Sequence, residues 1–589
     1  MPLPLLRAAA VAAVALLAAG CSLGGQSAAV ATAVAGAHTG GVLRVAIGQP
    51  GSIDPNNAYE PNGELVVSTM CDTLLQQDPI TGDLRGSLAE SFQATESGGK
   101  FILRLRKDLR FSNGRVLTAD DVAATLSRLA SRDYAGFRQK LLAPVDGFPE
   151  ISGAVETDDD SMKERLRGVR IIDGRSLELR LRYTGENGVQ FRLGDYARAL
   201  AETATTPVPR AVIQDDPESL EHDPVCVGPY HLAKPWNGTD REIRLVRDKH
   251  YTQGNPAYTS HGRGYADEIV FRIYPDAAAR AAAFRRGEVD VAPLSPTDVG
   301  RVPASMVQTG SGPAMEYVGV ASRGPYANPK VRAALSLALD RTALATSVYA
   351  GLAEPATGFF PPALGKALSS QDACDLSTRR LPRGTYLSYP VTGRNLLPAT
   401  ADVAGAKALL VGANLPIGGP PLTLRYNVDG RNPALAKAVA KAWQDVLGIR
   451  TRLVPMRWDD YVAMATSATG FDGAFVESWT PDYPGPEQYI GPLFTADAVG
   501  KANWSHFTDP SFDTELARYI RAQEDAADLA VSYRNAETFL CANLPLLPVV
   551  EAKKATAVDT AHFATATSAW VHRGTGDVLL RELFKKGTS

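Results

Sequence analysis

Strand-like and helix-like segments alternate along most of this chain, and this alternation limits its fold more than any other feature. Apolar residues at every second position, or in one short continuous run, predict strands. Such strands are expected at 42–47, 101–106, 177–181, 422–426 and 449–454. Apolar residues three and four positions apart, after a residue that can cap a helix, predict helices that begin at Thr118, Asn328 and Asn432. The chain is therefore predicted to fold as an α/β protein with mixed sheets.

The N-terminal segment has the features of a bacterial lipoprotein signal. Arg7 is followed by an apolar run, Ala8 to Gly20, that ends in small residues directly before Cys21. These are the parts of a secretory signal, and the run is shorter than the roughly 20 apolar residues that span a bilayer. Because a cysteine after the cut supplies a thiol for acylation, we expect residues 1–20 to be a signal peptide and Cys21 to carry a membrane-anchoring lipid. An ordinary secretion signal with an incidental cysteine is the alternative.

Residues 21–40 are predicted to be a flexible tether. The stretch from Ser22 to Gly41 consists almost entirely of Ala, Gly, Ser, Thr and Val and has no periodic pattern. A flexible chain of about 20 residues has an r.m.s. reach of roughly 25 Å. The folded part of the chain could therefore move near a membrane without lying on it.

Four cysteines remain in the body of the chain after Cys21. They are Cys71, Cys226, Cys374 and Cys541. An even number in a secreted chain is compatible with two disulfides, and four cysteines allow three pairings. The sequence does not choose among these pairings. Buried free thiols are the alternative, because a thiol packs as a small apolar group.

Composition and motifs argue against several classes of function. The chain has 61 Lys+Arg and 64 Asp+Glu, dispersed along the sequence, so no nucleic-acid partner is expected. The sequence contains no Gly-x-Ser-x-Gly, no His-Glu-x-x-His and no phosphate-binding loop, so the evidence for catalysis is thin. The eight histidines are scattered, without the i, i+4 spacing that typically pairs metal ligands. No catalytic residue, metal site or cofactor is therefore predicted.

Six segments with recognisable motifs follow one another along nearly the whole chain after the tether. They are Gly41 to Val45, Phe111 to Val122, Val227 to Tyr230, Gly287 to Asp290, Val331 to Arg341 and Trp479 to Pro486. The last of them contains the pattern Trp-x-x-Asp-Tyr-Pro. Taken in order, these segments resemble the extracytoplasmic solute-binding proteins of peptide- and nickel-type ABC importers, known as family 5. Cys226 departs from that family, in which a small residue more usually precedes the Gly-Pro-aromatic turn.

The resemblance implies a two-lobed fold of the periplasmic-binding-protein type (cluster C), with an extra inserted domain and a hinge of two crossing strands. The lobes of such proteins close on their ligand. Transferred to this chain, lobe one would comprise 41–71, 196–271 and 548–589, the inserted domain 72–195, and lobe two 272–547. The crossing strands are expected at 269–273 and 544–550. The chain is expected to be a monomer.

Asp482, in the Trp-x-x-Asp-Tyr-Pro pattern, is the predicted centre of the ligand site. In peptide-binding relatives the acid of this motif receives the α-ammonium group of the ligand, and a carboxylate in a dry cleft needs a cationic partner. Asp-Tyr-Pro is also typical of a turn, so a purely structural aspartate is the alternative. The full predicted set is Asp482, Trp479, Thr480, Tyr483, Trp458, Tyr59 and Glu60. For Trp458 and its neighbour Tyr461, a position in the core is the alternative.

Together these features predict a lipid-anchored receptor that captures di- or oligopeptides by lobe closure and delivers them to the membrane permease of an ABC importer. A ligand that bridges both lobes would favour the closed state. An oligosaccharide, an opine or a metal chelate is an alternative cargo within the same family. From a different class, an extracytoplasmic hydrolase could use Glu477 and Asp482 as paired carboxylates. A signalling receptor without transport is a third alternative.

Overall fold

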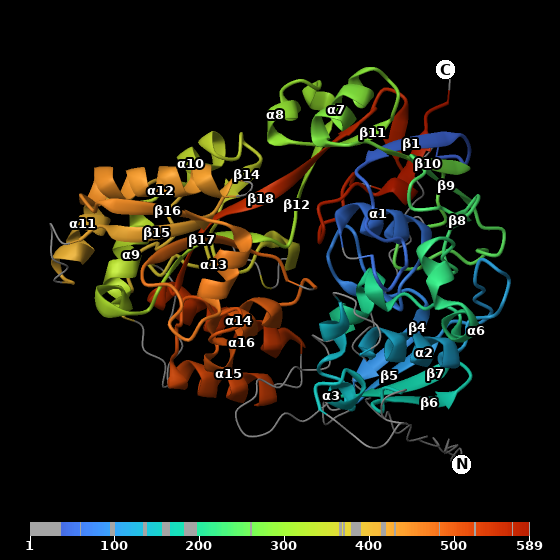
Figure 1. Cartoon of the computed structure of the whole chain (residues 1–589), viewed down its shortest axis with the longest axis horizontal. Helices are drawn as coiled ribbons and strands as arrows, with labels where there is room; N and C mark the ends of the chain where they lie inside the picture. Colours follow the sequence, from blue (N-terminus) through green and yellow to red (C-terminus); the bar gives the residue numbers. More distant parts are fainter. Residues whose placement is uncertain are drawn as a thin grey trace, which may run out of the picture. The chain divides into compact units, whose positions relative to one another are not determined.

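Figure 1 shows the computed structural model of the chain. It describes residues 37–58, 60–94, 100–132, 138–155, 165–181, 197–258, 262–364, 368, 372–377, 390–413, 420–428, 431–481, 483–522, 526–567 and 569–587. Within these residues strands and helices alternate along the chain, as the sequence pattern predicts. The α/β class with mixed sheets is therefore confirmed.

The largest sheet of the described residues has 12 strands and mixes parallel and antiparallel pairings. Its order is β16-β15-β17-β13-β18-β11-β1-β10-β9-β8, and β12 and β14 also pair with β18. The bounds are β1 (Val42–Ile47), β8 (Tyr230–Leu232), β9 (Glu242–Arg247), β10 (Glu268–Ile273), β11 (Val291–Leu294), β12 (Val307–Ser311), β13 (Met315–Val320), β14 (Ala353–Pro355), β15 (Leu422–Asn427), β16 (Thr451–Met456), β17 (Ala474–Trp479) and β18 (Leu546–Val558). The predicted strands at 42–47, 422–426 and 449–454 correspond to β1, β15 and β16.

β18, the long red strand of Figure 1, belongs to two halves of this sheet. Its first part pairs with β13 and β14, and its second part pairs with β11 and β12. Because β12 and β13 are consecutive and both lie beside β18, residues 307–320 and 546–558 connect the halves. The strand expected at 544–550 thus lies largely in β18, whereas 269–273 lies in β10, between β1 and β9, and is not a connection. Ile269 is fully buried there, which explains the apolar run.

A second, antiparallel sheet of four strands has the order β4-β5-β7-β6. Its strands are β4 (Ala89–Ala94), β5 (Lys100–Leu105), β6 (Val169–Asp173) and β7 (Ser176–Arg180), and α2 (Ala119–Ala130) contacts β6 and β7. Leu103 and Leu179 are fully buried, as the alternating pattern predicts. The capping box before α2 is also confirmed, because the backbone N–H of Thr118 donates to Oδ2 of Asp121 at 2.9 Å.

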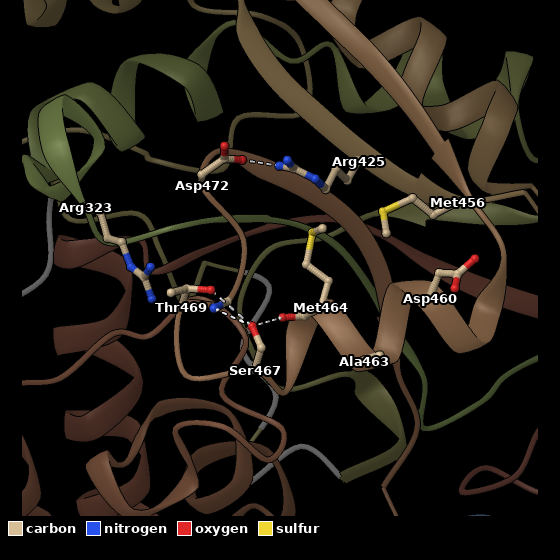
Figure 2. Close-up of a pocket in the computed structure, with 10 residues that line it drawn as sticks. Arg323, Arg425, Met456, Asp460, Ala463, Met464, Ser467, Thr469 and Asp472 are labelled. Carbon is tan, nitrogen blue, oxygen red and sulfur yellow. Dashed lines mark hydrogen bonds and ion pairs between the residues drawn. The ribbon is translucent and has the colours of Figure 1, made fainter.

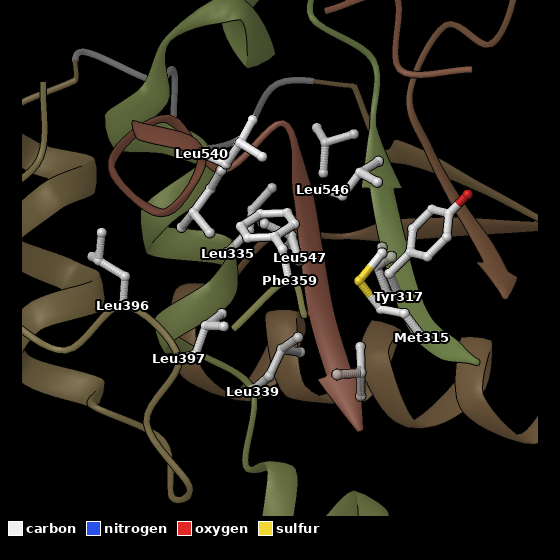
Figure 3. Close-up of a cluster of buried hydrophobic side chains, with 14 of the residues drawn as sticks. Met315, Tyr317, Leu335, Leu339, Phe359, Leu396, Leu397, Leu540, Leu546 and Leu547 are labelled. Atoms are coloured by element: carbon white, nitrogen blue, oxygen red, sulfur yellow. The ribbon is translucent and has the colours of Figure 1, made fainter. Parts of the chain in front are cut away.

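The main hydrophobic core packs around β13 and β18, as Figure 3 shows. Leu335 comes from α9 (Pro329–Leu337), Leu540 from α16 (Ala526–Asn543) and Leu547 from β18, and all three are fully buried. Trp443 of α12 (Asn432–Leu447) is fully buried as well, and its indole Nε1 donates to the carbonyl of Leu335 at 3.0 Å. Gly448 ends α12 in the left-handed conformation, the C-terminal stop that the sequence predicts.

Two disulfides join distant parts of the chain. Cys71 is bonded to Cys226 and Cys374 to Cys541, with Cα–Cα distances of 5.6 Å and 5.1 Å. The first links the end of α1 (Pro61–Met70) to the turn before β8, and the second links an irregular segment to α16. The structure thus selects one of the three pairings that the sequence left open.

The remaining elements are short or lie around these sheets. They are β2 (Leu75–Gln77), β3 (Leu84–Gly86), β19 (Phe563–Thr565), β20 (Leu583–Lys585), α3 (Phe148–Ile151), α6 (Arg210–Asp215), α7 (Ala277–Arg285), α8 (Pro296–Val299), α10 (Arg341–Ser347), α11 (Val403–Val411), α13 (Trp458–Ala465), α14 (Glu487–Phe494) and α15 (Pro510–Ala522). Among the helices of the described residues, none has both the length and the apolar composition needed to cross a bilayer.

Candidate functional site

The segment with the Trp-x-x-Asp-Tyr-Pro pattern begins at the carboxyl end of β17. β15 is parallel to both β16 and β17, and β13 is antiparallel to β17, with Met315 opposite Trp479. The carboxyl ends of β15, β16 and β17 therefore lie beside the start of β13. Together these strand ends form one edge of the sheet, which runs across the strands. In open α/β sheets this is the edge at which ligands bind. The topology thus puts Trp479 where a ligand site is expected.

Trp479 is half-buried and held in place by a specific hydrogen bond. Its indole Nε1 donates to the carbonyl of Gln488 in α14 at 2.8 Å, and its ring packs against the main hydrophobic core. The next residue, Thr480, is exposed. The segment therefore leaves β17 from a fixed aromatic anchor and then presents a hydroxyl-bearing residue to solvent.

Tyr483 packs in a different hydrophobic cluster from Trp479. It is 4% exposed and belongs to the cluster built on the four-stranded sheet and α2, which includes Leu103 and Leu126. Trp479, four residues earlier, packs against the cluster built on β13 and β18. The two aromatic residues of this motif are therefore divided between two hydrophobic clusters.

Glu477, two residues before Trp479, is a buried acid. It is 8% exposed, and its Oε1 accepts a hydrogen bond from the backbone N–H of Ser478 at 2.9 Å. Among the described residues its Oε2 has no hydrogen-bond partner. Burial, with a smaller contribution from the nearby carboxylate of Glu316, raises the pKa of Glu477 to about 7. Near neutral pH this carboxyl group can therefore exist in either protonation state.

Three further polar residues meet at the same edge of the sheet. The hydroxyl of Tyr349 donates to Oε2 of Glu316 in β13 at 3.3 Å, and the guanidinium carbon of Arg431 lies 5.0 Å from the centroid of the Tyr349 ring. Burial raises the pKa of Glu316, and the charge of Arg431 opposes that shift. Glu316 and Arg431 thus contact the same tyrosine. A carboxyl group and a guanidinium group placed in this way can each bind a ligand group of opposite charge.

Sequence reasoning missed Glu316, Tyr349 and Arg431. Arg431 directly precedes the Asn-Pro that starts α12, which is a detectable signal for a residue just after a strand. Glu316 and Tyr349 carry no such signal, because a strand glutamate and a helix-terminal tyrosine are common in any α/β chain. Only the pairing of β13 with β17 brings Glu316 beside Ser478 at the edge.

Trp458 and Glu60 have structural contacts of their own. Trp458 is 46% exposed on α13 and stacks on Tyr461, with ring centroids 6.3 Å apart. Tyr461 is fully buried and donates from its hydroxyl to the carbonyl of Val476 at 2.9 Å, so for Tyr461 the core alternative is confirmed. The carboxylate of Glu60 caps α1 by accepting from the backbone N–H groups of Asn62 and Gly63.

Three predicted residues lie outside the described residues. They are Asp482, Tyr59 and the lipidation site Cys21. Their roles stay predictions. Within the part of the chain that the structure describes, no group of three or more His, Cys, Asp or Glu side chains lies close enough to hold a metal ion.

Comparison with known proteins shows which family model matches this chain. The model of the bacterial extracellular solute-binding proteins, family 5, matches residues 83–501. The probable ABC transporter periplasmic-binding protein SapA of Escherichia coli K12 is 24% identical over 525 residues, which cover 85% of each chain. Di/tripeptide-binding protein 1 of Pseudomonas aeruginosa is 22% identical over 545 residues, which cover 89% of this chain and 91% of the relative.

Solved structures share the fold. The periplasmic murein tripeptide binding protein MppA, in its unliganded open form, superposes with a TM-score of 0.74 at 20% identity, over 92% of this chain and 97% of that chain. The prediction of the two-lobed periplasmic-binding-protein fold, made from six short motifs, is confirmed by this likeness and by the family match.

Proposed function

Because the chain belongs to the bacterial extracellular solute-binding proteins of family 5, we propose that it captures peptides outside the cytoplasm and delivers them to the permease of an ABC importer. Members of this family are binding proteins of transporters and not enzymes, so the hydrolase alternative with Glu477 and Asp482 is set aside. The observation that carries the proposal is that Trp479 and Tyr483 pack in two different hydrophobic clusters, at and beyond the carboxyl end of β17. In open α/β sheets, ligands bind at the carboxyl ends of the strands.

The mechanism that we propose is closure of two lobes on the peptide. A ligand that contacts both lobes binds the closed state more tightly than the open state, and the population shifts by that difference in affinity. The resemblance places the first boundary between the lobes at 271–272, but the sheet places it between β12 and β13. Lobe one would therefore comprise 41–71, 196–311 and 553–589, and lobe two 315–552, with 72–195 as an inserted domain. The two segments beside each other in the sheet, β12–β13 and β18, would then be the connections that flex.

Asp482 is proposed to receive the α-ammonium group of the peptide. A charge-assisted hydrogen bond of this kind contributes about 1.5–3 kcal/mol, or roughly tenfold to a hundredfold in affinity. Backbone hydrogen bonds to an extended peptide would add affinity that does not depend on its side chains. Trp479, Thr480, Tyr483, Trp458, Tyr59 and Glu60 remain the proposed surroundings of this site.

The chain is also proposed to be a monomeric lipoprotein anchored through Cys21. The support is the short apolar run that ends directly before that cysteine. Expression of the full chain with radiolabelled palmitate is expected to label the wild-type protein, and Cys21→Ser to abolish the label and release the protein from the membrane fraction. Label retained in Cys21→Ser would contradict this assignment.

An acetylation experiment tests the role of Asp482. Calorimetry would compare a free-amine tripeptide with its N-acetylated form, because acetylation removes the ammonium group. The wild-type protein is expected to prefer the free amine at least tenfold, and Asp482→Asn to lose this preference. The control is Asp445→Asn, which removes an exposed carboxylate on α12. Equal binding of both peptides by the wild-type protein would refute the role of Asp482.

The identity of the cargo needs a separate measurement. Native mass spectrometry of the purified chain is expected to show co-purified peptides. An oligosaccharide, an opine or a metal chelate in their place would keep the receptor and change its cargo, and these alternatives differ from a peptide in mass.

A further inference from the structure

Residues 312–314 connect β12 to β13 and belong to neither strand. Ser311, the last residue of β12, pairs with Lys553 of β18 in one half of the large sheet. Met315, the first residue of β13, lies opposite Trp479 of β17 in the other half. The chain therefore passes between the two halves within three residues, and it enters the second half next to the strand position of Trp479.

The end of β12 is held against its own half of the sheet by two glycines. A Cβ atom at Gly310 would lie 2.8 Å from Cα of Gly576, so no side chain fits there. Gly576 has φ +72°, a backbone conformation that favours glycine. The backbone of β12 thus packs directly on the backbone near residue 576. This contact fixes the connection 312–314 on the side of the proposed lobe one.

Tyr489 of α14 holds the other side of the connection. Its hydroxyl donates to the carbonyl of Pro313. The side chain of Tyr489 is fully buried, and its ring meets the ring of Phe360 edge-on, with centroids 6.1 Å apart. Burial, with smaller contributions from Glu487 and Glu551, raises the pKa of Tyr489 well above its usual value, so the hydroxyl keeps its proton and remains a donor. Because the ring of Pro313 also fixes its φ, the bond holds the stiffest residue of the connection.

Tyr489 lies near the second connection as well. The charge of Glu551 acts on its hydroxyl, and Glu551 lies two residues before Lys553 in β18. Between these two residues β18 changes its partner from β14 to β12. One buried side chain is therefore close to both places where the chain passes between the halves of the sheet.

The residue before Tyr489 contacts the predicted ligand site. The indole Nε1 of Trp479 donates to the carbonyl of Gln488 at 2.8 Å. A peptide unit is planar, so the carbonyl of Gln488 and the Cα atom of Tyr489 move as one rigid group. A displacement of Trp479 therefore changes the position of Tyr489, and with it the hydrogen bond to Pro313.

The interior along this path is packed. Tyr489 and Gly312 are buried. A pocket of about 610 Å³ in the same half of the sheet lies beside α13, and its lining residues belong neither to α14 nor to the connection 312–314. Figure 2 shows this pocket, with Arg323 at one side and Asp460 at the other. Because a close-packed interior is stiff, a small displacement at one end of the path reaches the other end.

We propose that Tyr489 is a positioning residue for lobe closure, which couples the position of Trp479 to the conformation of residues 312–314. This inference rests on the proposed closure of two lobes on a ligand. The bond from Tyr489 to Pro313 stabilises the lobe arrangement of this structure, and a ligand that moves Trp479 weakens or strengthens that bond through Gln488. Coupling of this kind needs an element with two states that both sites bias. The connection 312–314 is that element.

Double electron–electron resonance tests the proposal by measuring distances between the lobes. The spin labels are attached after Lys234→Cys in lobe one and Lys441→Cys in lobe two, at side chains that are 69% and 77% exposed. The full chain also carries Cys21→Ser, so that only the two introduced cysteines react, because the other four form disulfides. This labelled chain is the parent for all variants, and distances are measured without ligand and with trialanine.

Without ligand, Tyr489→Phe is expected to change the ratio of the two lobe arrangements roughly twofold to tenfold relative to the parent, because one neutral hydrogen bond is lost. Trp479→Phe keeps an aromatic ring and removes the N–H donor, so it should change the ratio in the same direction. The double variant should change the ratio no more than Tyr489→Phe alone, because Trp479 acts through Tyr489.

Matched controls are two other buried tyrosines whose hydroxyls donate to backbone carbonyls. Tyr461 donates to Val476 and Tyr230 to Ala266, each at 2.9 Å. Tyr461→Phe and Tyr230→Phe should lower the Tm about as much as Tyr489→Phe but leave the distances between the lobes unchanged. A role of Tyr489 in stability alone would make all three variants alike in both measurements.

The outcomes separate this inference from the proposed closure on which it rests. An unchanged ratio in Tyr489→Phe, an equal change in the two controls, or additive effects of Trp479→Phe and Tyr489→Phe would each overturn the inference. If trialanine changes the distances in the parent while Tyr489→Phe has no effect, closure stands and only the coupling fails. One lobe arrangement in every variant, with and without trialanine, would refute the proposed closure and this inference with it.

Discussion

The two halves of the large sheet bury charge in different ways. Beside α1, Asp72 forms an ion pair with Arg581 at 2.5 Å, and the side chains are 1% and 5% exposed. In β17 and β18, Glu477 and Glu551 are each 8% exposed, yet among the described residues neither forms an ion pair. The first arrangement is a permanent internal contact. The second leaves acids whose protonation changes near neutral pH.

This difference separates charged groups that have a permanent partner from carboxyl groups whose protonation changes with pH. Arg581 also donates to the carbonyls of Thr69 and Cys71, so each of its three side-chain nitrogens donates to the end of α1 or the residues directly after it. Burial, with a smaller contribution from Glu354 on the neighbouring strand β14, raises the pKa of Glu551 to about 8. Because Glu551 lies in β18, which connects the halves of the sheet, the unfolding free energy of the protein should depend on pH through this residue.

Removal of the internal cation is expected to have the largest effect. Arg581→Met leaves the Asp72 carboxylate buried without a counter-charge, which costs about 3–5 kcal/mol of unfolding free energy. Urea unfolding at pH 7 measures it. The double variant Asp72→Asn with Arg581→Met should recover part of the loss, because no charge then remains buried. If Arg581→Met were as stable as the wild-type protein, the Asp72–Arg581 ion pair would not be the structural contact that this comparison takes it to be.

The acid in β18 should make stability depend on pH. The pKa of Glu551 rises from 4.5 to about 8, so between these values the unfolded chain loses the proton while the folded chain keeps it. Stability therefore falls as the pH rises from 4.5 to 8. Glu551→Gln should avoid this loss and gain on the order of 4 kcal/mol relative to the wild-type protein at pH 8.5. Urea unfolding at pH 5 and pH 8.5 checks this, and a gain of equal size at both pH values would contradict it.

Glu477 should behave in the same way with a smaller amplitude. Its pKa rises from 4.5 to about 7, so the destabilisation develops between those values and is complete above pH 7. Glu477→Gln is expected to gain on the order of 3 kcal/mol at pH 8 and little at pH 4.5. Thermal unfolding across this pH range measures the difference. A profile that is flat in both proteins would show that Glu477 is already paired.

Removal of an exposed ion pair is expected to change the unfolding free energy least. Lys441 and Asp445 on α12 lie 2.6 Å apart, with side chains that are 77% and 55% exposed. Lys441→Gln should change the unfolding free energy by about 0.3–0.5 kcal/mol, because water screens such a pair. Urea unfolding measures this difference, and roughly 0.5 M salt should abolish it, because salt screens exposed charges over a few ångströms. A loss above 1 kcal/mol would place this pair with the buried contacts.

The site was only partly predictable from sequence. The pattern around Trp479 directed attention to the carboxyl end of β17, because a strand followed by a turn is visible in a few residues. Glu316 could not be found in this way, since it faces Ser478 only through the pairing of β13 with β17. The prediction of a crossing strand at 269–273 was wrong for a related reason. A strand buried inside one sheet and a strand that connects two halves are equally apolar.

What the sequence determined by itself was local. The strand alternation at 101–105, the capping box at Thr118 and the stop at Gly448 depend on residues within one or two turns of each other. The tertiary structure alone decided which cysteines pair, over separations of 155 and 167 residues, and it alone brought Arg323 and Asp460 to one pocket. Such contacts are selected by the packing of the whole chain, and no short stretch of sequence carries that information.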